Sequence, residues 1–173
     1  MNNSLTGFDY VLDVFQNPEK FESLPKREEH YRLLCLWRIP SFEALSSWSL
    51  YETKSQNDFI LRRLEYDYHK HTLINNENPD IIGSEAIIDS VQLKNILKAF
   101  VELKIPIFHQ NDRVTILDGT SYGIEFGNWW QKTIVHWQES VNKEWYPLME
   151  LFNNTIKLMD HYLPKSTLRD FKL

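Results

Sequence analysis

Asp67, His69 and His71 are the residues whose types and spacing come nearest to a metal site. They stand at positions i, i+2 and i+4 of an expected strand, so their side chains point to the same face of a sheet. Two imidazoles and one carboxylate, with coordination positions left open, suit zinc or iron. The same face carries Arg63 and Glu65, which is also typical of an ordinary exposed strand. We therefore prefer an interpretation without a cofactor and keep this metal site as the alternative.

The remaining nucleophiles and bases form no catalytic motif. The chain has neither a Gly-x-Ser-x-Gly elbow nor a His-Glu-x-x-His sequence. Cys35 is the only cysteine, so it can form no internal disulfide, and it lies in an apolar run where a thiol is usually buried and unreactive. His109 with Asp112, or His136, could act as a general base only if folding placed a nucleophile beside it. The sequence favours a protein that is not an enzyme.

Aromatic side chains are abundant and favour a binding function. The 173 residues include 6 Trp, 8 Tyr and 10 Phe but only 5 Gly. Trp129 and Trp130 are neighbours on an expected strand, so they face opposite sides of the sheet. One can pack beneath a helix. The other is either covered by helices of the first half or exposed as an anchor, since Trp and Tyr are frequent in binding hot spots. The candidate anchors are Trp48, Tyr51 and Trp130.

The formal net charge is −5, and the acidity belongs to the first half. Residues 1–87 hold 9 Lys and Arg against 14 Asp and Glu, whereas residues 88–173 hold 10 of each. An acidic chain without a basic run is a poor candidate for binding nucleic acid. Acidic side chains would instead steer a basic protein partner. The residues expected to do so are Glu65, Asp67, Glu77 and Asp80.

The sequence shows no pattern typical of a secretory signal or of a membrane-spanning helix. The N-terminal residues lack the basic stretch and apolar run of a secretory signal. No stretch approaches the roughly 20 apolar residues of a membrane-spanning helix. We therefore expect a cytoplasmic protein that does not bind membranes.

Periodicity predicts an α+β protein with antiparallel sheets. Apolar residues recur at helical spacing in some segments and alternate in others, and Asp118-Gly119 is a strong hairpin signal. We expect one domain over residues 1–173, with a candidate subdomain seam at 71–88. The element order is βββα-βββα, preceded by two short helices and closed by an amphipathic helix. Expected helices cover residues 7–24, 89–103 and 145–163, and expected strands cover 30–39, 45–53, 58–70, 113–117, 121–126 and 129–138.

Two details of the first half carry specific expectations. Arg62 interrupts the otherwise apolar face of segment 58–70, which predicts an edge strand or a partly exposed surface. Residues 71–83 are polar and rich in turn formers, which predicts a loop.

The last third of the chain carries a recurring combination of motifs. Leu117-Asp118-Gly119-Thr120 is followed by Trp129-Trp130, by Trp137 and by Glu144-Trp145-Tyr146-Pro147-Leu148. This pattern resembles small uncharacterised bacterial cytoplasmic proteins, some of which are immunity or partner-binding proteins. The resemblance covers residues 117–151 and brings no catalytic residue with it. It implies an α+β fold and a function in binding another protein.

The sequence therefore predicts a non-enzymatic protein-binding module, with an immunity-type inhibitor as its specific form. The first alternative is a metal-binding protein or metal-dependent enzyme that uses Asp67, His69 and His71. The second is a homodimer that buries its spare tryptophan face between subunits.

Overall fold

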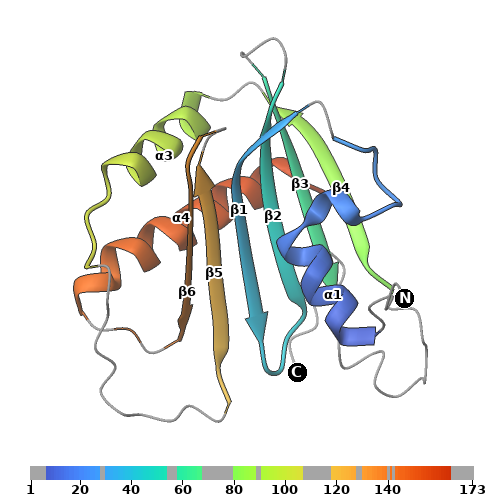
Figure 1. Cartoon of the computed structure of the whole chain (residues 1–173), viewed down its shortest axis with the longest axis horizontal. Helices are drawn as coiled ribbons and strands as arrows, with labels where there is room; N and C mark the ends of the chain where they lie inside the picture. Colours follow the sequence, from blue (N-terminus) through green and yellow to red (C-terminus); the bar gives the residue numbers. More distant parts are fainter. Residues whose placement is uncertain are drawn as a thin grey trace.

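One six-stranded antiparallel sheet forms the middle layer of the molecule (Figure 1). The computed structural model describes residues 7–27, 30–53, 58–67, 80–88, 91–106, 118–127, 130–139, 141 and 143–164. The strand order across the sheet is β4-β3-β2-β1-β5-β6, so β4 and β6 are the edges of the described sheet. The strands are β1 (Tyr31–Pro40), β2 (Leu45–Glu52), β3 (Phe59–Tyr66), β4 (Ile82–Ile88), β5 (Thr120–Gly127) and β6 (Lys132–Gln138).

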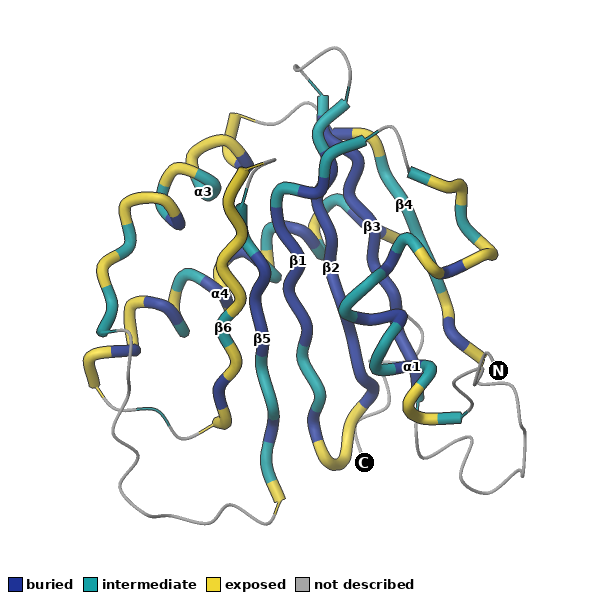
Figure 2. Tube along the Cα trace, in the orientation of Figure 1, coloured by how far each residue is buried: buried dark blue, intermediate teal, exposed yellow. Residues whose placement is uncertain are grey.

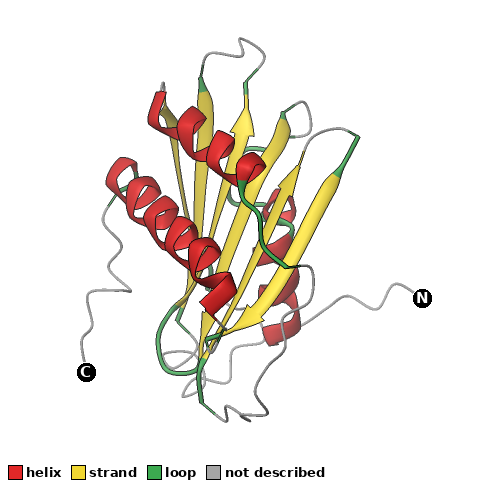
Figure 3. Ribbon diagram, turned by 90° about the vertical axis from the view of Figure 1, so that its left-hand side faces the viewer, coloured by secondary structure: helices red, strands yellow, loops and turns green. Residues whose placement is uncertain are grey.

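Helices lie on both faces of this sheet (Figure 3). On one face pack α3 (Val91–Glu102) and α4 (Tyr146–Tyr162), the latter preceded by the short 3-10 helix η2 (Lys143–Trp145). On the other face lie α1 (Gly7–Gln16) and the 3-10 helix η1 (Pro18–Lys20). Each longer helix is amphipathic, so it buries one apolar stripe against the strands.

Two apolar cores result from this layering. The larger core lies between the sheet and the α3–α4 pair, and it includes the almost fully buried Trp48, Leu61 and Phe152. The smaller core lies between the sheet and α1, where Val14 and Phe15 are completely buried. The middle strands are therefore buried on both faces, which removes the alternation expected of a half-exposed strand.

The α+β class with an antiparallel sheet is confirmed, as are the N-terminal and C-terminal helices. The helices expected at 89–103 and 145–163 correspond to α3 and α4, and the region 7–24 holds α1 and η1. β1 pairs with β2 on one side and with β5 on the other. β2, β3, β4 and α3 all lie between β1 and β5 in the sequence, so this pairing joins distant parts of the chain.

The element order differs from the expected one in the first half of the chain. Four strands, not three, precede α3 in the described part, because β4 pairs antiparallel with β3 from Ile82↔Glu65 to Ile88↔Phe59. The expected loop at 71–83 therefore ends in a strand. β4 escapes a pattern-based prediction because its central Gly83-Ser84-Glu85 is polar and carries no apolar alternation. The strand expected at 113–117 lies outside the described residues.

β3 lies inside the sheet, so the expectation of an edge or partly exposed strand is wrong. Arg62 is 0% exposed because it faces η1 and has several acceptors. It donates to the main-chain oxygens of Pro18 and Pro25 at 2.5 and 2.6 Å and, through Nε, to Glu85 Oε1 at 2.8 Å. Arg27 Nη2 donates to the other Glu85 oxygen at 2.5 Å. A charged residue on this apolar face thus signals a covering segment that accepts hydrogen bonds.

We expect Arg62→Met to lower the free energy of unfolding by about 3–5 kcal/mol, the scale for breaking a buried ion pair. The substitution keeps much of the volume but leaves the Pro18 and Pro25 oxygens without this donor. Urea-induced unfolding followed by circular dichroism measures the effect. The matched control is Lys20→Met, because Lys20 is 55% exposed in its pair with Asp13 and such pairs contribute about 1 kcal/mol or less. Equal losses in both variants would contradict the prediction.

Candidate functional site

The β5–β6 end of the sheet is the part that helices leave open on one face. Among the described residues, no helix lies over β5 and β6 on the α1 side (Figure 1). β6 is exposed along most of its length (Figure 2). We call the α1-side surface of β5 and β6 the outer face. The residues that form it alternate with those directed towards α3 and α4. They include Gly123, Glu125, Lys132, Ile134 and His136.

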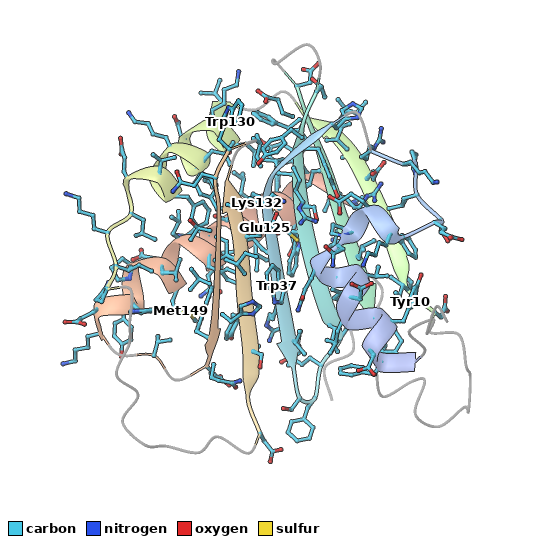
Figure 4. The ribbon with its side chains drawn as sticks, viewed as in Figure 1. Tyr10, Trp37, Glu125, Trp130, Lys132 and Met149 are labelled. Carbon is cyan, nitrogen blue, oxygen red and sulfur yellow. The ribbon has the colours of Figure 1, made fainter. Side chains whose placement is uncertain are left out.

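Trp37 of β1 forms the inner border of the outer face (Figure 4). Its indole lies against Gly123 so closely that a Cβ added there would stand 2.1 Å from Trp37 Cε2. The ring also contacts His136, with ring centroids 5.1 Å apart at an interplanar angle of 59°. Only glycine admits this close approach, and as a result Trp37 is just 3% exposed. The Trp37 indole therefore covers Gly123 of β5 and contacts His136 of β6 where no described helix does so.

Arg32, Glu125 and Lys132 form an ion network. Figure 4 shows Glu125 and Lys132 on the same strands as the outer face. Arg32 Nη2 donates to both oxygens of Glu125 at 2.9 Å, and Lys132 Nζ donates to Glu125 Oε1 at 2.9 Å. Arg32 Nη1 also donates to the main-chain oxygen of Gln16 at 3.1 Å and to Glu19 at 2.9 Å. The network therefore joins β1, β5 and β6 to the end of α1.

The Glu125 carboxyl is stabilised in its charged form. Burial by itself raises its pKa, but the hydrogen bonds from Lys132 and Arg32 outweigh this effect, and the net pKa lies below the ordinary glutamate value of 4.5. Glu85, held by Arg27 and Arg62, has its pKa lowered for the same reason. Both carboxylates are thus structural ion-pair partners.

We expect the protein to lose stability as the pH falls below about 4.5. A carboxyl whose folded-state pKa is depressed contributes stability that is present above its unfolded pKa and is lost as the pH falls through its folded pKa. Urea denaturation at several pH values from about 3 to about 7 measures how steeply the free energy of unfolding depends on pH. Glu125→Gln should unfold more easily at pH 7 and show a shallower loss at acid pH. An unchanged slope would contradict the assignment.

Trp130 and Ile134 are the exposed apolar residues at this end of the sheet. Trp130 is 96% exposed in a bend that Gln131 separates from β6, and Ile134 is 55% exposed on β6. Of the three candidate aromatic anchors, Trp130 is therefore the one that lies at the surface.

Trp48 and Tyr51 are buried, so the expectation that they are exposed anchors is wrong. Trp48 is 1% exposed under α4, and its Nε1 donates to Asp160 Oδ1 at 2.8 Å. Tyr51 is 0% exposed on the opposite face, with the Arg62 guanidinium carbon 5.7 Å from its ring centroid. β2 lacks alternation because both of its faces are covered. Burial on both faces and partial exposure produce the same weak pattern in the sequence.

The acidic residues expected to steer a basic partner do not form one surface in the described structure. Glu65 is buried, with Oε2 lying 3.1 Å from Arg63 Nε. Asp67 follows β3 and is half-buried, whereas Asp80 precedes β4 and is exposed. Glu77 lies outside the described residues. β3 and β4 are at the end of the sheet opposite β6, so these positions are remote from Trp130.

The metal hypothesis stays a prediction, because His69 and His71 lie outside the described residues. Within the part of the chain that the structure describes, no group of three His, Cys, Asp or Glu side chains could hold a metal ion. Cys35 is buried as expected, and burial raises the pKa of its thiol to about 11.

The outer face contains residues that the sequence did not single out, above all Trp37, Glu125 and Lys132. Gly123 was the available signal, because an isolated glycine in a strand often marks the close approach of another group. The ion network carried no signal, since Arg32 and Glu125 are 93 positions apart and pair only once β1 and β5 are neighbours.

Comparison with known proteins leaves the family open. No protein-family model, curated protein or solved structure matches the chain significantly. None of the described helices has the length and apolar character needed to cross a membrane. The resemblance over residues 117–151 stays a prediction.

Proposed function

We propose that this chain is a non-enzymatic protein-binding module that engages its partner at the β6 edge, with Trp130 and Ile134 as apolar anchors. The observation that carries the proposal is the 96% exposure of Trp130 beside an edge strand. Large apolar side chains are costly to leave in water, and Trp is the residue type most enriched in binding hot spots.

The edge itself supports recognition of an extended segment. β6 has β5 on one side and no described strand on the other. An exposed edge presents main-chain N–H and C=O groups that a partner strand can join by β-augmentation. Main-chain hydrogen bonds would then supply affinity, and contacts with Trp130 and Ile134 would supply specificity.

The charge near β6 favours an apolar partner segment over a strongly basic one. Lys132 is half-exposed and already paired with Glu125, and the exposed Asp80 belongs to the far end of the sheet. Of the acidic residues expected to steer a partner, the described ones are therefore not placed beside Trp130. The resemblance over residues 117–151 favours an immunity-type inhibitor, which would act by binding its protein partner through such a surface.

We expect Trp130→Ala to weaken partner binding by at least about 30-fold, the scale of a hot-spot residue. The partner is first captured from lysate of the source organism and identified by mass spectrometry, and its affinity for purified variants is then measured by calorimetry. Ile134→Ala should weaken binding less than Trp130→Ala. Phe42→Ala and Ile87→Ala are matched controls, because these residues are 59% and 75% exposed away from β6.

The proposal fails if the controls weaken binding as much as the β6 variants, or if no β6 variant changes the affinity. Light scattering tests the homodimer alternative. A mass near twice 20.8 kDa that falls to the monomer value in Trp130→Ala would identify a second copy as the partner.

A further inference from the structure

An apolar cavity of about 530 Å³ lies on the other side of β5 and β6, beneath α3. It is open to solvent on one side and is lined by side chains from elements that are far apart in the sequence. α3 and the segment after it form one wall, β5 and β6 form the opposite wall, and Leu148 in the first turn of α4 also lines it. Residues that represent these walls are Leu97, Phe100, Ile124, Phe126, Val135 and Leu148.

The size of the cavity is that of a small-molecule site. A volume of 530 Å³ falls within the range of about 300–1,000 Å³ that is usual for small-molecule sites. The space beneath α3 therefore has the dimensions of a ligand site.

A β-bulge in β1 contributes to the cavity wall. The register of β1 against β2 shifts between Arg32 and Leu34, so that Leu33 is the extra residue. Arg32 is directed to the ion network on the α1 side, whereas Leu33 lines the cavity on the opposite side. Bulges re-aim side chains and are over-represented next to functional sites. The bulge here provides one residue for the network and the next for the cavity.

The chemistry of the lining is apolar with a polar margin. None of the described lining side chains is ionisable, so a charged group in the interior would lack a counter-ion and would be costly to bury. Gln131 and Thr133 line the cavity and are also solvent-exposed, so they mark its mouth. The rings of Phe100 and Phe126, with centroids 5.8 Å apart, supply aromatic surface inside.

We propose that this cavity binds a small, uncharged, mainly apolar molecule. Its ring or short hydrocarbon part occupies the space between α3 and β5, and its hydrogen-bonding group is directed to Gln131 and Thr133 at the mouth. This site is separate from the outer face, because alternate side chains of β6 point to opposite sides of the sheet.

The test uses N-phenyl-1-naphthylamine, a neutral apolar dye whose fluorescence rises in apolar surroundings, with the full-length chain. We expect saturable binding of one dye per chain. Thr133→Trp, which fills the mouth, should weaken binding at least tenfold. Gln138→Trp is the matched control, because it places the same side chain on β6 at an exposed position of the outer face that does not line the cavity. It should bind within twofold of the unmodified protein.

Three results would overturn the proposal: no saturable binding, equal binding by Thr133→Trp and the unmodified chain, or equal loss in both variants. Circular dichroism checks that each variant is folded. If Thr133→Trp is unfolded, methyl NMR of the unmodified chain decides instead. The dye should then shift the methyl signals of Leu97 and Leu148 and leave those of Leu64, in the α1-side core, in place. Shifts spread over both cores, or none, would reject the cavity.

Discussion

Three buried arginines on the inner strands constrain how the sheet is covered. Arg32 on β1 and Arg62 on β3 face the α1 side, and Arg63 faces α4, where its Nη2 donates to the Pro164 oxygen at 2.5 Å. A buried guanidinium is tolerated only when most of its five N–H groups find acceptors. Main-chain oxygens of Gln16, Pro18, Pro25 and Pro164 supply them. The segments after α1 and after α4 are thereby held against the strands.

This constraint also explains why the two ends of the sheet differ. The main-chain acceptors of Arg32 and Arg62 belong to the end of α1, to η1 and to the segment after it, so this short region covers the α1 side of the inner strands (Figure 1). Among the described residues, the Trp37 indole and the Glu125–Lys132 pair cover the same face of β5 and β6. The opposite face of these strands is covered by α3, which leaves a cavity beneath it. Both proposed sites therefore belong to the half of the sheet that the α1–η1 region does not cover.

Local pattern was sufficient for the amphipathic helices and most strands, because their information lies in the period of apolar residues. It failed where tertiary neighbours decide the outcome. A polar Arg62 in an apolar strand was interpreted as exposure, although distant carbonyl groups satisfy it. The weak alternation around Trp48 and Tyr51 was interpreted in the same way, although helices cover both faces. Trp130, one of the candidate anchors, is exposed, but it lies in a bend before β6 and not on the strand that the sequence predicted over 129–138. The sequence could not show that β5 lies beside β1, and so it missed the outer face.

The alternation of β6 separates the two proposed sites physically. Thr133 and Val135 point beneath α3, whereas Lys132, Ile134 and His136 point to the outer face. A strand added at the β6 edge would bond to main-chain groups in the plane of the sheet, and it would leave the cavity lining on β5 in place. A ligand beneath α3 would likewise leave Ile134 at the surface. Because successive side chains of a strand point to opposite faces of the sheet, a substitution at one position of β6 can change one proposed site, and a substitution at the next position can change the other.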